Sequence, residues 1–257
     1  MRSSSAADFP DAPASPSSPA TTLAHSRCES PALIFLSHVH SVPLINPLNI
    51  TSAGRHFYLA VDRLQFKMRT LLELLGVLSD RHGALPISIC VSSRDELDAV
   101  CAAVANLPFA SSSPLYSDQA EAERASVLEK SRRAAIQRNQ IENTDIAGSP
   151  KLESLVSKLS IAVVTDACLP SAAMGEAPLM ARVLINYELP TKKEAYLRRI
   201  SACLSADGIV INMVVGGEVA LLKSLEETSG FVIAEMPIHV HMLLLTLTLH
   251  SVTLLVI

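Results

Sequence analysis

The sequence of 257 residues is long enough for one α/β domain of about 150–200 residues with further segments at its ends. Hydrophobic residues make up 49% of it and aromatic residues only 4%, so the core is expected to be aliphatic. The formal net charge of −4 argues against a strongly basic nucleic-acid-binding protein, and any contact with RNA must come from a local, salt-sensitive patch. The five cysteines form no CxxC pair, which predicts neither a disulfide framework nor a zinc site and favours a reducing compartment.

The N-terminal residues 1–50 are predicted to be a disordered segment, because residues 1–30 are mostly Ser, Ala and Pro. A transit peptide is the alternative, but Asp8, Asp11 and the scarcity of Arg speak against it. We therefore expect a cytoplasmic or nuclear protein, with an organellar location as the alternative. His38 and His40 alternate with apolar neighbours and have no third ligand nearby, so they do not predict a metal site.

The C-terminal residues 241–257 form an apolar tail. The stretch from Met242 to Ile257 has 16 residues, fewer than the roughly 20 that a helix needs to cross a bilayer. A tail anchor, an extra β-strand and an ending replaced by altered splicing are the three interpretations. The abrupt change of composition after Ile238 favours the third, so a membrane partner is not expected.

Between residues 51 and 240, short apolar runs alternate with amphipathic stretches, as strands and helices do. Strands are predicted at His56–Val61, Ile87–Val91, Ser160–Thr165, Arg182–Tyr187, Ile209–Val214 and Phe231–Ala234. Helices are predicted at Lys67–Arg81, Asp95–Asn106, Ala120–Arg138, Lys192–Cys203 and Glu218–Ser229. Residues 139–158, where Asn, Gly, Ser and Pro cluster, are predicted to be a loop insertion.

Several of these strands are apolar with little alternation, which is typical of strands covered on both faces. Alternating strands and helices of this kind predict an α/β fold with a parallel sheet and helices on both faces. Ligands in that architecture bind beyond the carboxyl ends of the strands. This rule places Ser92, Ser93 and Arg94, together with Thr165 and Asp166, at the binding edge of the sheet.

Five segments of the chain, taken in order, carry the remaining signal. The first three are ISICVSSRDELDAV with Arg94 at the place of the arginine in Asn-Thr-Arg, SDQAEAER with Asp118 and Arg124, and VVTDACLP with Thr165 and Asp166. VLINYELPTKKEAYLRRI and GIVINMV follow in register. On these segments the chain from 56 to 240 resembles the C-terminal, second RecA-like domain of DEAD-box RNA helicases, most closely the translation-initiation type.

The resemblance implies a RecA-like fold of the P-loop NTPase superfamily, a three-layer αβα sandwich. It also implies an RNA-binding surface made by Arg94, Asp118, Arg124, Thr165 and Asp166. For Asp118, Arg124 and Asp166 an intradomain role is favoured over RNA binding: Asp166 would cap a turn, and Arg124 would make a surface or intradomain ion pair.

The departures from the family pattern concern catalysis. Where the family has His-Arg-Ile-Gly-Arg-x-Gly-Arg, this chain keeps Arg199 but has Ala202 and Ser205 in place of the two phosphate-facing arginines. An arginine finger contributes on the order of 10³–10⁵ in rate. Gly175 is the candidate for the glycine of the preceding motif, so Gly175 and Arg199 are the expected nucleotide-facing remnants.

The sequence contains neither a GxxxxGK[ST] phosphate loop nor an Asp-Glu-Ala-Asp segment. We therefore expect no metal site, no catalytic residue and no cofactor, with ATP and Mg²⁺ bound only if a first RecA domain is supplied. The interpretation is a module that binds RNA weakly, or a partner protein such as a translation factor, without ATPase activity of its own. The alternative is a component of an ATP-dependent helicase that works with a first RecA domain supplied in trans. A basic cluster of Lys192, Lys193, Arg198 and Arg199 would contact RNA or an acidic partner, or be a solvated face.

Overall fold

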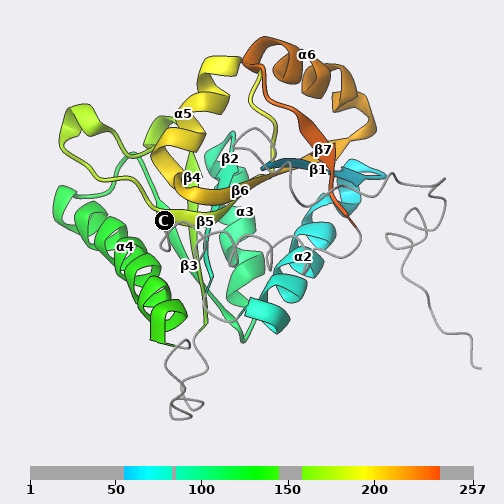
Figure 1. Ribbon diagram of the computed structural model, residues 1–257. Coiled ribbons are helices and arrows are strands. Elements are labelled where there is room, and N and C mark those ends of the chain that lie inside the picture. The colour runs from blue at the N-terminus through cyan, green and yellow to red at the C-terminus, as the bar shows by residue number, and fades with distance from the viewer. Residues whose placement is uncertain (1–54, 83–84, 145–157, 238–257) are drawn as a thin grey trace, which may run out of the picture.

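The computed structural model describes residues 55–82, 85–144 and 158–237 (Figure 1). Its strands are β1 (His56–Val61), β2 (Pro86–Val91), β3 (Ala110–Leu115), β4 (Leu159–Thr165), β5 (Ala181–Asn186), β6 (Leu204–Val215) and β7 (Ile233–Glu235). Its α-helices are α2 (Lys67–His82), α3 (Arg94–Ala105), α4 (Glu121–Thr144), α5 (Lys193–Cys203) and α6 (Val219–Ser229). Short 3₁₀ turns η3 (Leu64–Phe66), η5 (Asp166–Cys168), η6 (Ala172–Met174) and η7 (Gly216–Glu218) connect them.

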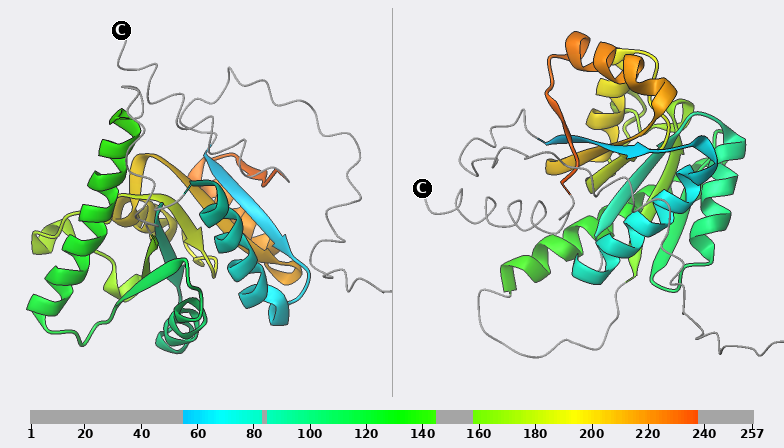
Figure 2. Two further views of the ribbon diagram at one scale, coloured as in Figure 1. Left: turned by 90° about the horizontal axis from the view of Figure 1, so that it is seen from below. Right: turned by 90° about the vertical axis from the view of Figure 1, so that its right-hand side faces the viewer.

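All seven strands run parallel in one sheet, in the order β3-β4-β2-β5-β6-β1-β7. The chain moves from β1 through β2 to β3 at one edge and then returns through β4, β5 and β6 to β7. Because right-handed crossovers made in opposite directions put their helices on opposite faces, α2 and α3 cover one face and α4, α5 and α6 the other (Figures 1 and 2). The predicted RecA-like three-layer α/β fold is confirmed.

Each face of the sheet carries its own apolar core, because successive strand residues point to opposite sides. Alternate residues of β4 show this: Ile161 and Val163 pack under α2 and α3, whereas Ala162 and Val164 pack under α4 to α6. Every residue of β2 and β5 is buried. This two-sided burial is why the central strands read as unbroken apolar runs in the sequence.

The predicted elements agree with the structure except at three places. β1 has the predicted bounds, and most other elements begin or end within two residues of the prediction. β6 begins at Leu204, five residues before the predicted Ile209. β3 was not predicted, because its sequence ASSSPL is rich in serine and contains a proline. A proline is tolerated there since β3 is an edge strand that pairs with β4 alone.

The predicted loop insertion at residues 139–158 is wrong in its first part. Helix α4 continues to Thr144, because the next helix-breaking residues are Gly148 and Pro150. Residues 145–157, the N-terminal segment 1–50 and the apolar tail 241–257 lie outside the described residues. Among the helices that are described, none is long and apolar enough to cross a membrane.

A buried chain of polar side chains runs beneath α5 on the face that it shares with α6. The Asn186 amide donates to Asn212 at 2.8 Å, and the Asn212 amide donates to the carbonyl of Phe57 at 3.0 Å and to the Tyr196 hydroxyl at 3.2 Å. The Tyr196 hydroxyl lies 2.9 Å from Nδ1 of His56 and is placed to donate to it. Because these groups are hydrogen-bonded to one another, the bonds offset the cost of burying them and tie β1, β5, β6 and α5 together.

His56 is expected to make stability depend on pH. Burial lowers its pKa from 6.5 to about 4, so the unfolded chain takes up a proton at a higher pH than the folded one. The free energy of unfolding should therefore fall as the pH decreases from 6.5 towards 4, by roughly 2–3 kcal/mol from this residue. Urea denaturation at a series of pH values measures this change.

The matched variant is His56→Phe, which keeps an aromatic ring against Phe231, whose ring centroid lies 4.2 Å from that of His56. Its stability should fall less steeply over the same pH range. Identical pH profiles for the wild type and the variant would contradict the assignment of this effect to His56.

Candidate functional site at the carboxyl edge of the sheet

The carboxyl ends of β2, β4 and β5 form the candidate site. These strands are neighbours, and the connections after them diverge: α3 leaves β2 towards one face, while the segments after β4 and β5 lead to the other. Such a switch point opens a crevice at the strand ends. Ser92, Ser93 and Arg94 follow β2 and are exposed, and Thr165 ends β4 half-buried, so the structure brings the predicted edge residues together.

Arg94 presents an exposed guanidinium at this edge. It lies 4.8 Å from the ring centroid of Tyr116 and donates to Asp118 at 2.9 Å. The Tyr116 hydroxyl donates to Asp98 at 2.6 Å, a bond that raises the pKa of Tyr116 to about 12. The hydrogen bond from Arg94 lowers the pKa of Asp118. The Arg94–Asp118 pair is more than half exposed on both sides, so it is a weak ion pair that another anion can replace.

Arg199, in contrast, is completely buried and serves the domain's own structure. Its Nε and Nη2 donate to the two carboxylate oxygens of Asp166 at 2.7 and 2.8 Å. Its Nη1 donates to Oδ1 of Asn186 at 3.0 Å and to the carbonyl of Glu188 at 2.7 Å. Four of the five N–H groups of a guanidinium are thereby used. The geometry ties the end of β4 to α5, and Asp166 is engaged in this fork-to-fork pair.

Arg124 is likewise paired within the domain. Its Nε and Nη2 donate to the Glu176 carboxylate at 2.5 and 3.0 Å, and Nη2 also donates to the carbonyl of Cys168 at 3.1 Å. The bond from Arg124 lowers the pKa of Glu176 and keeps it ionised. Gly175, in the left-handed conformation at φ 72°, forms the turn that brings Glu176 back towards Arg124. The turn at Gly175 therefore positions the adjacent Glu176 to pair with Arg124.

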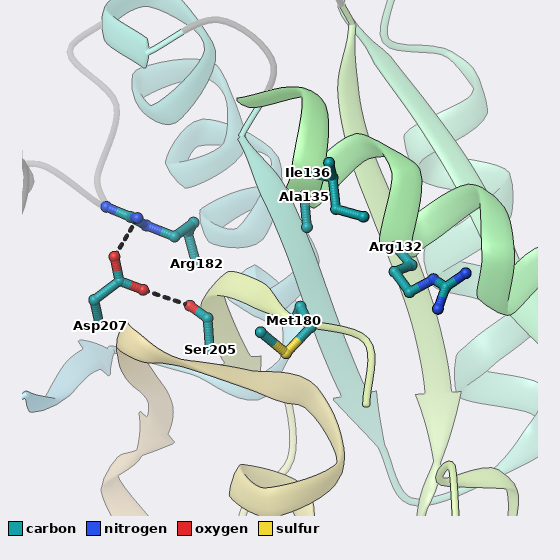
Figure 3. Close-up of a pocket in the computed structure, with 7 residues that line it drawn as sticks. All are labelled: Arg132, Ala135, Ile136, Met180, Arg182, Ser205 and Asp207. Carbon is teal, nitrogen blue, oxygen red and sulfur yellow. Dashed lines mark hydrogen bonds and ion pairs between the residues drawn. The ribbon is translucent and has the colours of Figure 1, made fainter. Parts of the chain in front are cut away.

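The two positions expected to have lost phosphate-facing arginines lie in different places. Ala202 is buried and lines a pocket between α5 and the segment after β4. Ser205 lies at the amino end of β6, where it donates to Asp207 at 2.9 Å beside the Arg182–Asp207 ion pair (Figure 3). They separate because α5 passes directly into β6 at Leu204.

Two residues that the sequence did not single out complete the edge. Glu188 accepts a hydrogen bond from the backbone N–H of Ser92 at 2.6 Å and so occupies an amide at the end of β2. Lys67 is almost fully buried, 3.4 Å from the Glu218 carboxylate and 5.4 Å from the ring centroid of Tyr187. A basic residue at the start of a predicted helix gives no sign of such burial, which depends on contacts with Tyr187 after β5 and Glu218 after β6. Within residues 55–82, 85–144 and 158–237, no group of three or more His, Cys, Asp or Glu side chains is arranged to hold a metal ion.

No sequence-family model matches the chain, but its fold matches solved structures of DEAD-box proteins. The C-terminal domain of the DEAD-box protein Dbp5 matches with a TM-score of 0.50 and 17% identity, over 72% of this chain and 91% of that one. E. coli SrmB, solved bound to regulator of ribonuclease activity A, matches with a TM-score of 0.50, 18% identity and the same coverages. A variant S. cerevisiae Dbp5 C-terminal domain bound to Gle1 and IP6 matches with a TM-score of 0.50 and 17% identity, over 70% of this chain and 88% of that one. At these identities the comparisons show a shared fold.

The structural role of Arg199 leads to a stability prediction. Arg199→Ala leaves Asp166 and Asn186 without their donor, so we expect the free energy of unfolding to drop by about 3 kcal/mol. The adjacent Arg198 is exposed, and Arg198→Ala should change the free energy by less than about 0.5 kcal/mol. Urea denaturation of the three proteins measures both changes. Equal losses in the two variants would show that Arg199 does not hold α5 to β4.

Proposed function

We propose that this chain, whose fold is that of the DEAD-box helicase C-terminal domains, is a helicase-like module that binds single-stranded RNA weakly and without ATPase activity of its own. The observation that carries the proposal is the contrast between Arg94 and Arg199. Arg94 offers an exposed guanidinium at the ligand-binding edge, whereas Arg199 is buried and engaged by Asp166, Asn186 and Glu188.

The binding part of the proposal rests on the chemistry of the edge. A guanidinium binds phosphate oxygens with parallel hydrogen bonds, and stacking on Tyr116 limits the freedom that Arg94 loses on binding. The half-buried end of β4 at Thr165 adds a hydroxyl of the kind that commonly contacts phosphate and sugar. Asp118, once released from Arg94, can accept a hydrogen bond from a ribose 2′-hydroxyl, which DNA lacks. Asp166 and Arg124 support the edge through their internal ion pairs.

The proposal that the module has no ATPase activity of its own rests on Ala202 in α5 and Ser205 in β6. Ala202 cannot stabilise the charge that develops on a transferred phosphoryl group, and Ser205 lies at the opposite edge of the sheet beside Asp207. The sequence also carries no phosphate loop. ATP and Mg²⁺ would then be bound only where a first RecA domain, or a chain carrying one, supplies their ligands. That arrangement is the alternative to the proposal.

The test is binding of a fluorescently labelled single-stranded RNA to the full chain at low and physiological salt, with and without ATP and Mg²⁺. We expect weak binding that weakens as salt rises, with a shallow slope of about −0.7 for each phosphate contacted, and no effect of ATP. Arg94→Ala should weaken binding roughly threefold to tenfold and reduce the slope by about one contact. A DNA of the same sequence should bind less tightly.

The matched control is Arg133→Ala. Arg133 is also exposed and paired with one carboxylate, that of Glu129, but it lies on α4 away from the carboxyl edge. Its removal changes the net charge by the same amount and should leave RNA binding nearly unchanged. Equal effects of the two variants would mean that RNA binds by nonspecific charge attraction and not at Arg94. Binding that strengthens with ATP would favour the helicase-component alternative instead.

A further inference from the structure

A second concave site lies beside α5, apart from Arg94. It is a pocket of about 400 Å³ between α5 and the segment that follows β4, a size within the range of ligand and side-chain pockets. The buried residues of its lining are apolar and make up its floor: Leu169, Pro170 and Ala202. Apart from Ala167, Ala172 and Pro178, the other lining residues are polar or charged, so the pocket offers both apolar and polar groups.

The two carboxylates that line this pocket are already neutralised. Asp166 is held by the buried guanidinium of Arg199, and Glu176 by the half-buried guanidinium of Arg124, each through two hydrogen bonds. They therefore offer little attraction to a cation, and they do not repel an anion as free carboxylates would.

Arg198 is the cation at this pocket that remains available. Its Nη2 donates to the backbone carbonyl of Asp166 at 2.5 Å, and in the described part of the chain no carboxylate lies within ion-pair distance of it. The backbone bond fixes the side chain at the pocket, and because Arg198 is exposed and a guanidinium has five N–H groups, further donors remain for a ligand. The pocket thus carries one net positive charge next to an apolar floor.

The walls of the pocket are held in place before any ligand binds. The N–H of Leu179 donates to the carbonyl of Ala202 at 3.0 Å, which joins the segment after β4 to the end of α5. The N–H of Ser171 donates to the Glu176 carboxylate at 3.1 Å, and the N–H of Glu176 donates back to the carbonyl of Ser171 at 3.1 Å. A preformed cavity loses little conformational entropy when it is filled.

We infer that this pocket is a docking site for a protein partner that inserts an apolar side chain flanked by a carboxylate. The apolar side chain would lie on Leu169, Pro170 and Ala202, and the carboxylate would accept hydrogen bonds from Arg198. The surroundings favour a protein: Met174, in the segment that follows β4, is 79% exposed and Leu197 on α5 is 38% exposed, and Met and Arg are enriched at interfaces. Lys192 and Lys193 at the start of α5 are exposed as well and add positive charge that suits an acidic segment.

The small positive charge of the pocket argues against a nucleotide as its occupant. A triphosphate carries several charges and is usually held by several donors or a metal ion. Here a single exposed arginine faces an apolar floor, and it is the one cation among the described residues that line the pocket. A single carboxylate next to an apolar group matches this charge balance better.

The probe for the test is an acetylated and amidated peptide of sequence Gly-Glu-Phe-Glu-Gly, titrated into the full chain and followed by NMR chemical shifts of assigned amides. We expect shifts confined to Asp166–Pro178 and to α5, with weak saturable binding. The same peptide with both Glu replaced by Gln, or with Phe replaced by Gly, should bind about tenfold more weakly. ATP should have no effect on any of these titrations.

Two variants locate the site. Arg198 lies on the surface, and Arg198→Glu should weaken binding of the peptide about tenfold. Arg133→Glu makes the same change of charge on α4 and should leave peptide binding unchanged. Ala202→Leu fills the cavity and should also abolish binding, with its fold checked by circular dichroism. Equal binding of the Gln peptide, shifts outside the pocket, or unchanged affinity of Arg198→Glu would overturn the inference. Since RNA binding is tested through Arg94, either proposal can fail without the other.

Discussion

The bidentate ion pair between Arg199 and Asp166 is the interaction on which the arrangement of the carboxyl edge depends. Arg199 comes from α5 and Asp166 from the end of β4, and Asn186 at the end of β5 accepts from the same guanidinium. Because the arginine is fully buried, its charge has to be balanced inside the protein, and removal of either partner would leave an uncompensated charge. The pair therefore determines where α5 lies relative to the strand ends.

The same guanidinium connects the edge to the polar chain beneath α5. Asn186, which accepts from Arg199, donates to Asn212, and Asn212 in turn reaches Tyr196 and the backbone of β1. A polar network of this kind is satisfied only in one register of strands and helix. A shift of α5 along the sheet would break these hydrogen bonds and cost free energy. The apolar residues around the network account for most of the buried surface.

The burial of Arg199 has a functional consequence as well. An arginine that is engaged on all sides by its own domain cannot reorient towards a ligand without breaking those bonds. Near the carboxyl ends of the strands, two exposed guanidinium groups have weak or no carboxylate pairing within the described residues: Arg94 after β2 and Arg198 beside the pocket. The two differ in their surroundings: an aromatic ring and an exposed carboxylate for Arg94, and an apolar cavity for Arg198. This difference is why we assign RNA to one and a protein segment to the other.

The sequence by itself determined the parallel α/β architecture, because unbroken apolar runs and helical periodicity are local patterns that survive folding. It also placed Arg94 and Thr165 at the carboxyl edge of the sheet, since the carboxyl ends of parallel strands share one edge. It did not reveal β3, whose serines and Pro114 are tolerated only because an edge strand has a single neighbour.

Tertiary structure alone decided which charges are available. Arg198 and Arg199 are adjacent and chemically identical, but consecutive helical residues point about 100° apart, so packing of α5 buries one and exposes the other. Likewise, Ala202 and Ser205 end at different sites because the chain passes from α5 straight into β6. Local sequence specifies the elements, whereas the partner of a buried charge comes from residues distant in the chain, and only the folded molecule brings them within hydrogen-bonding distance.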